Sequence, residues 1–257
     1  MLPRMPLITA DEPAAFTIER PQGRSEFLLV CDHASRLVPH SLGSLGLDDT
    51  QLASHIAWDI GAAGVAKRLS TALDATLLLQ SYSRLVIDCN RPPGSESSIP
   101  TRSEYVRIAA NEGLTTADVA ARVTEIFAPY HAAISTVLDQ RRAAGTRTVL
   151  ISMHSFTPVY LGESRPWKIG LMFRKDLRLG HALLELLRQD VSLQAGENLP
   201  YAISDDTDYT IPVHGEARRL PHVGIEIRQD LVTDTLGQQE WATRLASLLP
   251  LAGKGIQ

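Results

Sequence analysis

Short apolar runs that end in polar residues recur along the chain and predict strands of a buried sheet. Phe27–Cys31 is wholly apolar, and Thr148–Ile151 is nearly so. Runs without polar alternation are typical of strands that are covered on both faces. Further runs predict strands at Ala75–Gln80, Leu85–Cys89, Lys168–Phe173 and Val223–Ile227, and a short extended piece at Tyr209–Val213.

Apolar residues at helical spacing fill the segments between these runs. Val65, Leu69 and Leu73 would lie on one face of a helix over Ala62–Leu73. Other helices are predicted at Leu52–Ile56, Thr116–Ala144 with a break or kink at Pro129, Gly180–Gln189 and Glu240–Leu249. Because strands alternate with helices, we expect an α/β fold of three layers (αβα) around a mixed, mostly parallel central sheet.

The length and composition favour a single domain. The chain has 257 residues, of which 44% are hydrophobic, and this is enough to build one large core. We expect one domain over residues 1–257, with residues 1–25 as a loosely packed lead-in. Residues 92–115 begin with prolines and serines and predict a long loop, which is often functional.

The charge balance excludes several classes of function. The net charge is −4, so the chain lacks the excess of basic residues that is typical of proteins that bind nucleic acid or an anionic membrane. Pro3, Arg4 and Pro6 interrupt the N-terminal segment, which therefore predicts neither a secretory signal nor a membrane anchor. Cys31 and Cys89 lie in apolar runs and are interpreted as reduced core thiols, which favours a cytoplasmic protein.

Two histidines follow buried strands and suggest a metal or acid–base site. His33 comes directly after Phe27–Cys31, and His154 comes after Thr148–Ile151. The carboxyl ends of strands in open α/β sheets are where ligands bind. Histidines at such ends suit a catalytic zinc ion, which takes three protein ligands and leaves one position for water. The alternative is that each histidine is only hydrogen-bonded at a strand end.

Glu226 interrupts the last apolar strand, and a carboxylate in such a strand either pairs with a cation or has a function. In the first interpretation Glu226 pairs with Arg228, which projects to the same face of the strand, or with a lysine. In the second it is a general base whose pKa is raised by burial and which takes a proton from metal-bound water.

Basic and amide side chains flank the run Leu85–Cys89. Arg84 precedes this run, and Asn90 and Arg91 follow it. Arginine binds carboxylates with two hydrogen bonds, so these residues favour an anionic substrate and an oxyanion in the reaction. Asp88, within the run, is expected to brace one of the arginines. The alternative interpretation is an ordinary surface network of ion pairs.

Asp59 and three further histidines have alternative interpretations. Asp59 is either the cap of the helix that follows or the third metal ligand. His55 would lie on the same face as Asp59 and either supports a ligand or faces solvent. His214 lies in a polar loop that could line a substrate mouth, whereas His131 follows Pro129 in a helical segment and is interpreted as structural.

Together these residues resemble the N-formylglutamate amidohydrolase family. The resemblance covers most of the chain in one order and is most specific in the combination of three motifs, SRLVIDCNR, HSFTP and IEIRQDL. The matching pieces are CDHAS (31–35), HIAWDIGA (55–62), YSRLVIDCNRP (82–92), PYH (129–131), HSFTP (154–158), RPWKIG (165–170), NLPY (198–201) and IEIRQDL (225–231).

The resemblance implies a metal-dependent hydrolase with a fold similar to that of zinc carboxypeptidases and aspartoacylases. It implies one Zn²⁺ ion per chain, or another divalent metal, held by His33 and His154. The expected substrate is a small anionic N-acyl amino acid, and N-formylglutamate would release formate. In the related carboxypeptidases a glutamate ligand stands three residues after the first histidine, where this chain has Arg36. Asp59 is therefore our candidate for the third ligand.

The resemblance also implies roles for the other candidates. Asn90 and Arg91 resemble the pair that grips the substrate carboxylate in those relatives, and Arg84 is expected to polarise the scissile carbonyl. Glu226 resembles the general base on a late strand. We also assign Ser155, His214 and Arg228 to substrate binding.

Two other functions remain compatible with the sequence. The first is hydrolysis of a different N-acyl amino acid or small amide. The second is a metal-free binding or regulatory protein with the same fold, which only the departure at Arg36 favours. The intact His33, His154 and Glu226 favour a hydrolase.

Overall fold

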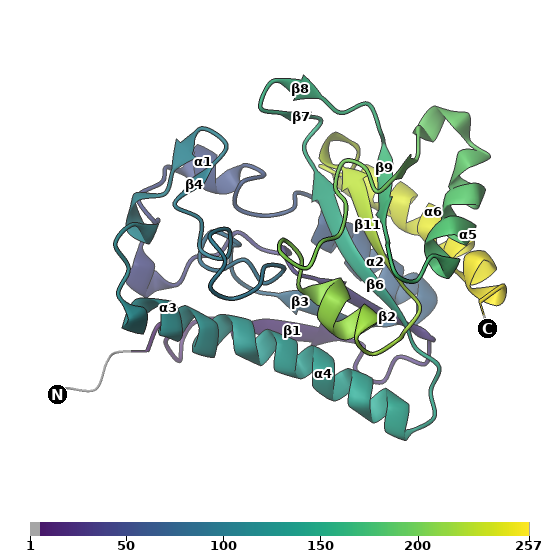
Figure 1. Cartoon of the computed structure of the whole chain (residues 1–257), viewed down its shortest axis with the longest axis horizontal. Coiled ribbons are helices and arrows are strands. Elements are labelled where there is room, and N and C mark those ends of the chain that lie inside the picture. Colours follow the sequence, from purple (N-terminus) through teal and green to yellow (C-terminus); the bar gives the residue numbers. More distant parts are fainter. Residues whose placement is uncertain (1–5, 257) are drawn as a thin grey trace.

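A seven-stranded sheet forms the middle layer of the molecule, in a computed structural model that describes residues 6–256 (Figure 1). Its strands lie in the order β1-β3-β2-β6-β11-β9-β10. Their bounds are Phe16–Glu19 (β1), Phe27–Cys31 (β2), Thr76–Gln80 (β3), Val149–Phe156 (β6), Ile169–Met172 (β9), Gly196–Glu197 (β10) and His222–Arg228 (β11).

The sheet is mixed but mostly parallel, as the sequence predicts. Strands β3, β2, β6 and β11 run parallel to one another, and β10 runs parallel to β9. Only two pairings are antiparallel, that of β1 with β3 and that of β9 with β11. The carboxyl ends of β2, β6 and β11 therefore meet at one edge of the sheet, and these strands carry or precede His33, His154 and Glu226.

Helices cover both faces and give the expected three layers. Apolar side chains of α2 (Ala62–Leu73), α5 (Arg178–Arg188) and α6 (Thr235–Lys254) pack on one face. The other face packs against α4 (Ala128–Ala143) and the turn before it. Helix α3 (Thr116–Arg122) begins at a capping box between Thr115 and Asp118. A π-helical turn at Val123–Phe127 joins α3 to α4 just before Pro129.

Smaller elements surround the edge where the three strands end. They are the helix α1 (Asp49–Ala53), the hairpin of β4 (Arg102–Ser103) and β5 (Val106–Arg107), and the hairpin of β7 (Val159–Tyr160) and β8 (Glu163–Ser164). Figure 1 shows α1 and β4 on one side of this edge and β7 and β8 on the other. These elements are therefore placed to form the walls of a pocket above the sheet.

The run at residues 85–89 is not a strand, so this prediction is wrong. The segment folds as turns, with the Val86 N–H donating to the Ser83 carbonyl. Its apolar side chains are still buried in the core. Side chains replace the missing sheet partners, because Asn111 donates to the Leu85 carbonyl and the buried Arg122 donates to the Val86 carbonyl. An apolar run can thus be buried without joining the sheet.

Two other predictions require correction. The piece at 209–213 is not extended, because Ile211–Glu216 forms a π-helical turn. Part of the expected lead-in is packed rather than loose, because Phe16–Glu19 (β1) pairs with β3 and Leu7 is buried. Residues 1–5 of that expected lead-in lie outside the described part of the chain.

Cys31 and Cys89 are both buried and free, as expected for core thiols. Between residues 6 and 256 the structure contains no helix with the length and apolar character needed to cross a bilayer.

A pair of stacked histidines lies in the core beside α4. His131 Nε2 is 2.7 Å from the Cys89 carbonyl oxygen and so carries a proton, and His131 Nδ1 accepts from His214 Nε2 at 3.0 Å. Both rings are therefore neutral. Burial lowers the pKa of His131 to about 4, and burial together with the neighbouring His131 lowers the pKa of His214 to about 3. This arrangement confirms His131 as structural.

This pair should make the protein less stable in acid. A histidine whose folded-state pKa is lowered contributes its full stability above about pH 6.5, and this contribution is lost as the pH falls, because only the unfolded chain takes up the proton. When the pH falls from 7 to 5, we expect each of the two rings to lower the free energy of unfolding by about 2 kcal/mol. Urea unfolding of His131→Gln should therefore depend less steeply on pH than that of the wild type.

The exposed His40, whose side chain is 75% accessible, supplies the control variant His40→Gln. That variant should keep the wild-type pH dependence. Equal pH dependence in His131→Gln and the wild type would contradict the neutral, buried pair.

Candidate active site

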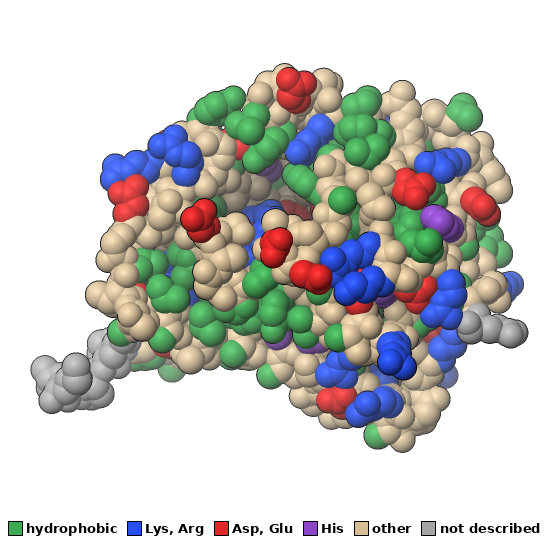
Figure 2. Space-filling model, in the orientation of Figure 1, with side chains coloured by type: hydrophobic (Ala, Val, Ile, Leu, Met, Phe, Trp, Pro, Cys, Tyr) green, Lys and Arg blue, Asp and Glu red, His purple; other side chains and the backbone are tan. Residues whose placement is uncertain are grey.

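A cavity of about 460 Å³ opens at the edge where β2, β6 and β11 end. Figure 2 shows a hollow near the centre of this face of the molecule. His33, Asp59, Arg84, His154 and Glu226 all line this cavity. The structure thus brings together the candidate metal ligands and both candidate catalytic residues.

Sheet register explains why these side chains converge. His154 on β6 lies directly opposite Glu226 on the neighbouring parallel strand β11. Side chains alternate between the faces of a strand, and the core residues Met153 and Ile225 pack on the opposite face, with α2, α5 and α6. His154 and Glu226 therefore both project from the face that α4 covers. His33 joins them from the loop after β2.

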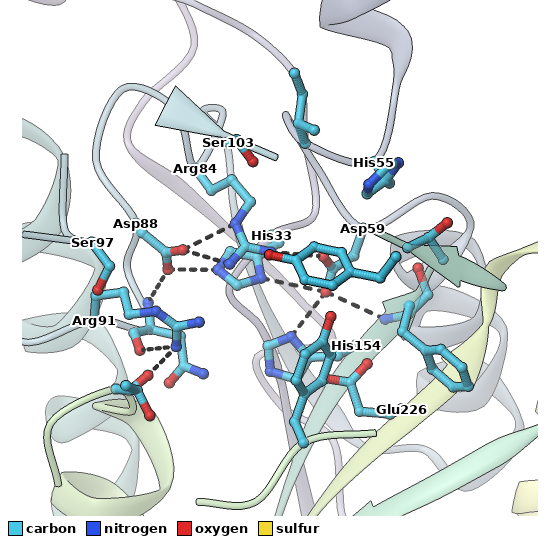
Figure 3. A pocket seen from close by; sticks show the side chains of 18 of the residues that line it. His33, His55, Asp59, Arg84, Asp88, Arg91, Ser97, Ser103, His154 and Glu226 are labelled. Carbon is cyan, nitrogen blue, oxygen red and sulfur yellow. Dashed lines mark hydrogen bonds and ion pairs between the residues drawn. The ribbon is translucent and has the colours of Figure 1, made fainter. Parts of the chain in front are cut away.

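The Asp59 carboxylate lies between the two histidines (Figure 3). Its Oδ2 atom is 3.3 Å from His33 Nδ1 and 2.9 Å from His154 Nδ1, and it accepts a hydrogen bond from the Ser155 N–H. The residue that caps α2 is Gly61, at φ 80°, so Asp59 does not act as the helix cap. Of the two interpretations of Asp59, the structure therefore favours the metal ligand.

The far side of each histidine ring is held by another polar group. His33 Nε2 donates to Asp88 Oδ1 at 2.7 Å, and His154 Nε2 lies 2.8 Å from Ser152 Oγ. These bonds place a proton on Nε2 of each ring, so Nδ1 of each ring is the atom that would bind a metal beside Asp59. Behind Ser152, the buried Asp32 accepts hydrogen bonds from the hydroxyls of Tyr130 and Thr210.

The three inner residues fit a zinc ion. One ligand atom from each of His33, Asp59 and His154 lies within 4.8 Å of the others. In tetrahedral zinc sites with bonds of 2.0–2.1 Å, neighbouring ligand atoms are roughly 3.3 Å apart, close to the 3.3 and 2.9 Å between Asp59 Oδ2 and the two Nδ1 atoms. Two histidines and one carboxylate form the ligand set of several catalytic zinc sites, which keep the fourth position open. The donor chemistry and the spacing therefore both suit the metal.

Arg84 is engaged with the carboxylates of the site. Its Nε and Nη2 atoms donate to Asp88 Oδ2 at 3.0 and 2.7 Å, and its Nη1 atom lies 3.4 Å from Asp59 Oδ1. The expectation that Asp88 braces an arginine is confirmed. Burial alone would raise the pKa of Asp88, but Arg84 and His33 together hold it well below its usual range. Asp88 is thus a stable anion behind His33.

Glu226 has no cationic partner of its own. Its side chain is buried, and among residues 6–256 its Oε2 atom has no hydrogen-bond partner. Burial raises the pKa of Glu226 to about 7. Arg228 pairs instead with Asp230, with its Nε 2.8 Å from Asp230 Oδ1. The interpretation of Glu226 as half of an ion pair with Arg228 is therefore wrong.

The expected substrate-binding residues divide into two groups. Asn90, Arg91 and Ser155 line the cavity. Asn90 Oδ1 also accepts the N–H groups of residues 209 and 210, so this side chain fixes the segment that closes one wall. The structure does not bring His214 or Arg228 to the cavity, because His214 is buried against His131 and Arg228 pairs with Asp230.

Two tyrosines that line the cavity, Tyr160 and Tyr201, were not candidates from the sequence, and both contact Arg165, which lies beside the cavity without lining it. The Arg165 guanidinium lies 4.6 Å from the ring centre of Tyr160 and 4.8 Å from that of Tyr201, and it donates to the Tyr201 hydroxyl at 2.8 Å. Gly170 permits this arrangement, because a Cβ atom there would lie 1.7 Å from the Leu199 carbonyl oxygen. On the other wall, His55 lies 3.3 Å from Glu104. The motifs HIAWDIGA, RPWKIG and NLPY contain His55, Arg165 with Gly170, and Tyr201, and they were the sequence signal for these residues.

Comparisons with known proteins identify one family and its fold. The family model for N-formylglutamate amidohydrolase matches residues 25–233. A solved structure of gene product Atu2144 from Agrobacterium tumefaciens is 40% identical, with a TM-score of 0.94, and the match covers 97% of this chain and 99% of that one.

A second solved structure shares the fold at lower identity. It is N-formylglutamate amidohydrolase from Ralstonia eutropha JMP134, which is 19% identical with a TM-score of 0.67 and matches over 95% of this chain and 98% of that one. No curated protein matches the sequence. Since the family model spans most of the chain, including His33, Asp59, His154 and Glu226, the protein belongs to the N-formylglutamate amidohydrolase family.

Proposed function

We propose that the protein is a zinc-dependent amidohydrolase that cleaves the N-acyl amide of an acidic amino acid such as N-formylglutamate. The observation that carries this proposal is the buried, unpartnered carboxylate of Glu226 beside the cluster of His33, Asp59 and His154. The family and the printed name of the Ralstonia eutropha relative support the formyl substrate. Two buried free thiols support a cytoplasmic location.

His33, Asp59 and His154 would hold the zinc ion. When bound, zinc polarises a carbonyl oxygen and lowers the pKa of water, which makes hydrolysis feasible near neutral pH. Asp88 and Ser152 orient the two rings from behind and keep their Nδ1 lone pairs available. A small anionic molecule is the expected partner, since the cavity is lined by several arginines.

Glu226 moves the proton in this proposal. With a pKa near 7, its carboxylate can accept a proton from the attacking water and then return it to the nitrogen of the leaving amine. The unpartnered Oε2 is free to form these bonds. The low-dielectric surroundings that raise this pKa also exclude bulk water from the reacting amide.

Arginine and asparagine side chains would orient the substrate. Arg91 and Asn90 are adjacent in the cavity wall and would bind the α-carboxylate. Arg84 uses three of its five N–H groups on Asp88 and Asp59, so two remain to donate to the acyl oxygen as negative charge develops there. Ser155 is held by the Ile60 carbonyl and shapes the floor of the cavity.

Removing one metal ligand should deplete the metal. Elemental analysis of His33→Ala, His154→Ala and Asp59→Ala should show less bound zinc than the wild type, because each substitution removes one of three donors. The exposed His40 offers a matched control, and His40→Ala should keep the wild-type zinc content. Full zinc content in both the His33→Ala and the His154→Ala protein would refute this ligand set.

A hydrolysis panel tests the substrate class. The protein should hydrolyse N-formylglutamate, lose this activity after chelation and regain it when zinc is added. N-formyl-, N-acetyl- and N-succinyl-glutamate and -aspartate, measured as kcat/KM under the same conditions, define the preferred acyl group and amino acid. A clear preference for another N-acyl amino acid would favour the alternative amidohydrolase. If the protein binds these compounds without zinc and hydrolyses none of them, the result would favour a regulatory protein.

Glu226→Gln should retain zinc but lose turnover. Removal of a general base typically lowers the rate by roughly 10²–10⁴-fold, and glutamine keeps the shape of the side chain. Turnover should be measured on protein shown to contain zinc. Glu240→Gln, at an exposed position of α6, serves as the control and should be fully active. A zinc-loaded Glu226→Gln protein with the wild-type rate would exclude Glu226 as the base.

A further inference from the structure

One cationic side chain that lines the cavity has no ion-pair partner among the described residues. Almost every charged side chain that lines the cavity has an ionic partner there. Arg84 and His33 each pair with both Asp59 and Asp88. His154 pairs with Asp59, Arg91 with Asp208, and His55 with Glu104. Among residues 6–256, two lining residues form no ion pair, namely Arg102 and Glu226. Glu226 has a role in the proposed reaction, whereas Arg102 has none so far.

Arg102 belongs to the wall of the cavity and not to its floor. It lies on β4, where it is paired across the hairpin with Arg107 of β5. The two arginines differ in their partners, because Arg107 donates to Glu112 and Arg102 makes no hydrogen bond within the described residues. Arg102 is exposed and lines the cavity, whereas Arg107 does not. Arg102 interacts with Glu112 only through longer-range electrostatics, because Arg107 holds that carboxylate directly, so the guanidinium of Arg102 stays available to a ligand that enters.

The position of Arg102 suits the far end of a substrate. In Figure 3 its neighbour Ser103 lies on the opposite side of the candidate metal ligands from Glu226. A substrate whose amide is placed beside Glu226 would therefore extend across the cavity toward the β4–β5 hairpin. Arg91, which lies 4.0 Å from Asp208, is on a different wall next to Asn90 and is assigned to the α-carboxylate.

We propose that Arg102 binds the side-chain carboxylate of a dianionic N-acyl amino acid and so sets the preference for acidic over neutral side chains. This inference rests on the proposed function, which supplies the first carboxylate and the amide. A second carboxylate needs a second cation, and Arg84 is already shared by two aspartates. Arg102 is the remaining unpaired cation of the cavity within the described chain.

N-formylglutamine provides the matched probe, because it replaces only the side-chain carboxylate by a neutral amide of the same shape. The wild type should favour N-formylglutamate over N-formylglutamine in kcat/KM. In Arg102→Gln, kcat/KM for N-formylglutamate should fall roughly tenfold, mainly through KM, as expected for the loss of one hydrogen bond to a charged group. The value for N-formylglutamine should hardly change.

Arg107→Gln on the same hairpin is the control and should keep the wild-type preference. A purely structural effect of Arg102→Gln would lower kcat/KM for both substrates by the same factor. This outcome would leave the preference for N-formylglutamate unchanged and would overturn the proposal.

A binding measurement separates this proposal from the proposed function. Calorimetric titration of both compounds into the full chain carrying Glu226→Gln needs no turnover. The Glu226→Gln protein should bind N-formylglutamate more tightly than N-formylglutamine, and this difference should disappear when Arg102→Gln is introduced as a second substitution. This result would support the role of Arg102 even if the wild type hydrolysed neither compound. Equal affinity for the two compounds without the Arg102 substitution would overturn the role of Arg102, whatever the hydrolysis panel gives.

Discussion

The Asp59 carboxylate contacts His33, His154 and Arg84 while it is almost completely buried, and the rest of the site depends on this interaction. A buried charge costs several kcal/mol unless it is paired and hydrogen-bonded. Burial opposes ionisation, but the two histidines hold the pKa of Asp59 below its usual range. Its partners come from the ends of two strands and from the segment after β3. The site is therefore complete only when these elements have packed together.

A second group of buried polar residues supports this arrangement from the other side. Arg122 donates to the Val86 carbonyl and to Asn111, and Asn111 donates to the Leu85 carbonyl. These bonds satisfy the backbone of a segment that is buried but has no strand partner. The same segment carries Asp88, which orients His33. The irregular backbone that the sequence does not reveal is thus what places a carboxylate behind a histidine.

Features that depend on local sequence were predictable, whereas features that depend on contacts between distant parts of the chain were not. The strands at Phe27–Cys31 and Val223–Ile227 were predictable because their signal is local, namely an apolar run. The exceptional position of Glu226 was predictable for the same reason, because it is one carboxylate within such a run. The turn structure of Leu85–Cys89 was not predictable, because an apolar run looks the same in a strand and in a buried turn. The burial of His214 depends on His131, 83 residues away. The unpaired state of Arg102 depends on where every other charge finds its partner.

The antiparallel strand β9 has a further consequence for how the pocket is built. The chain leaves β6 and enters β9 at the same edge of the sheet, so the connection over residues 157–168 does not need to cross a face as a helix. The β7–β8 hairpin and its Tyr160 are inserted in this connection and contribute little to the core. During evolution this wall can change in length and composition while β6 keeps His154 in place. Substrate range can diverge here without disturbing His33, Asp59 and His154, the candidate metal ligands.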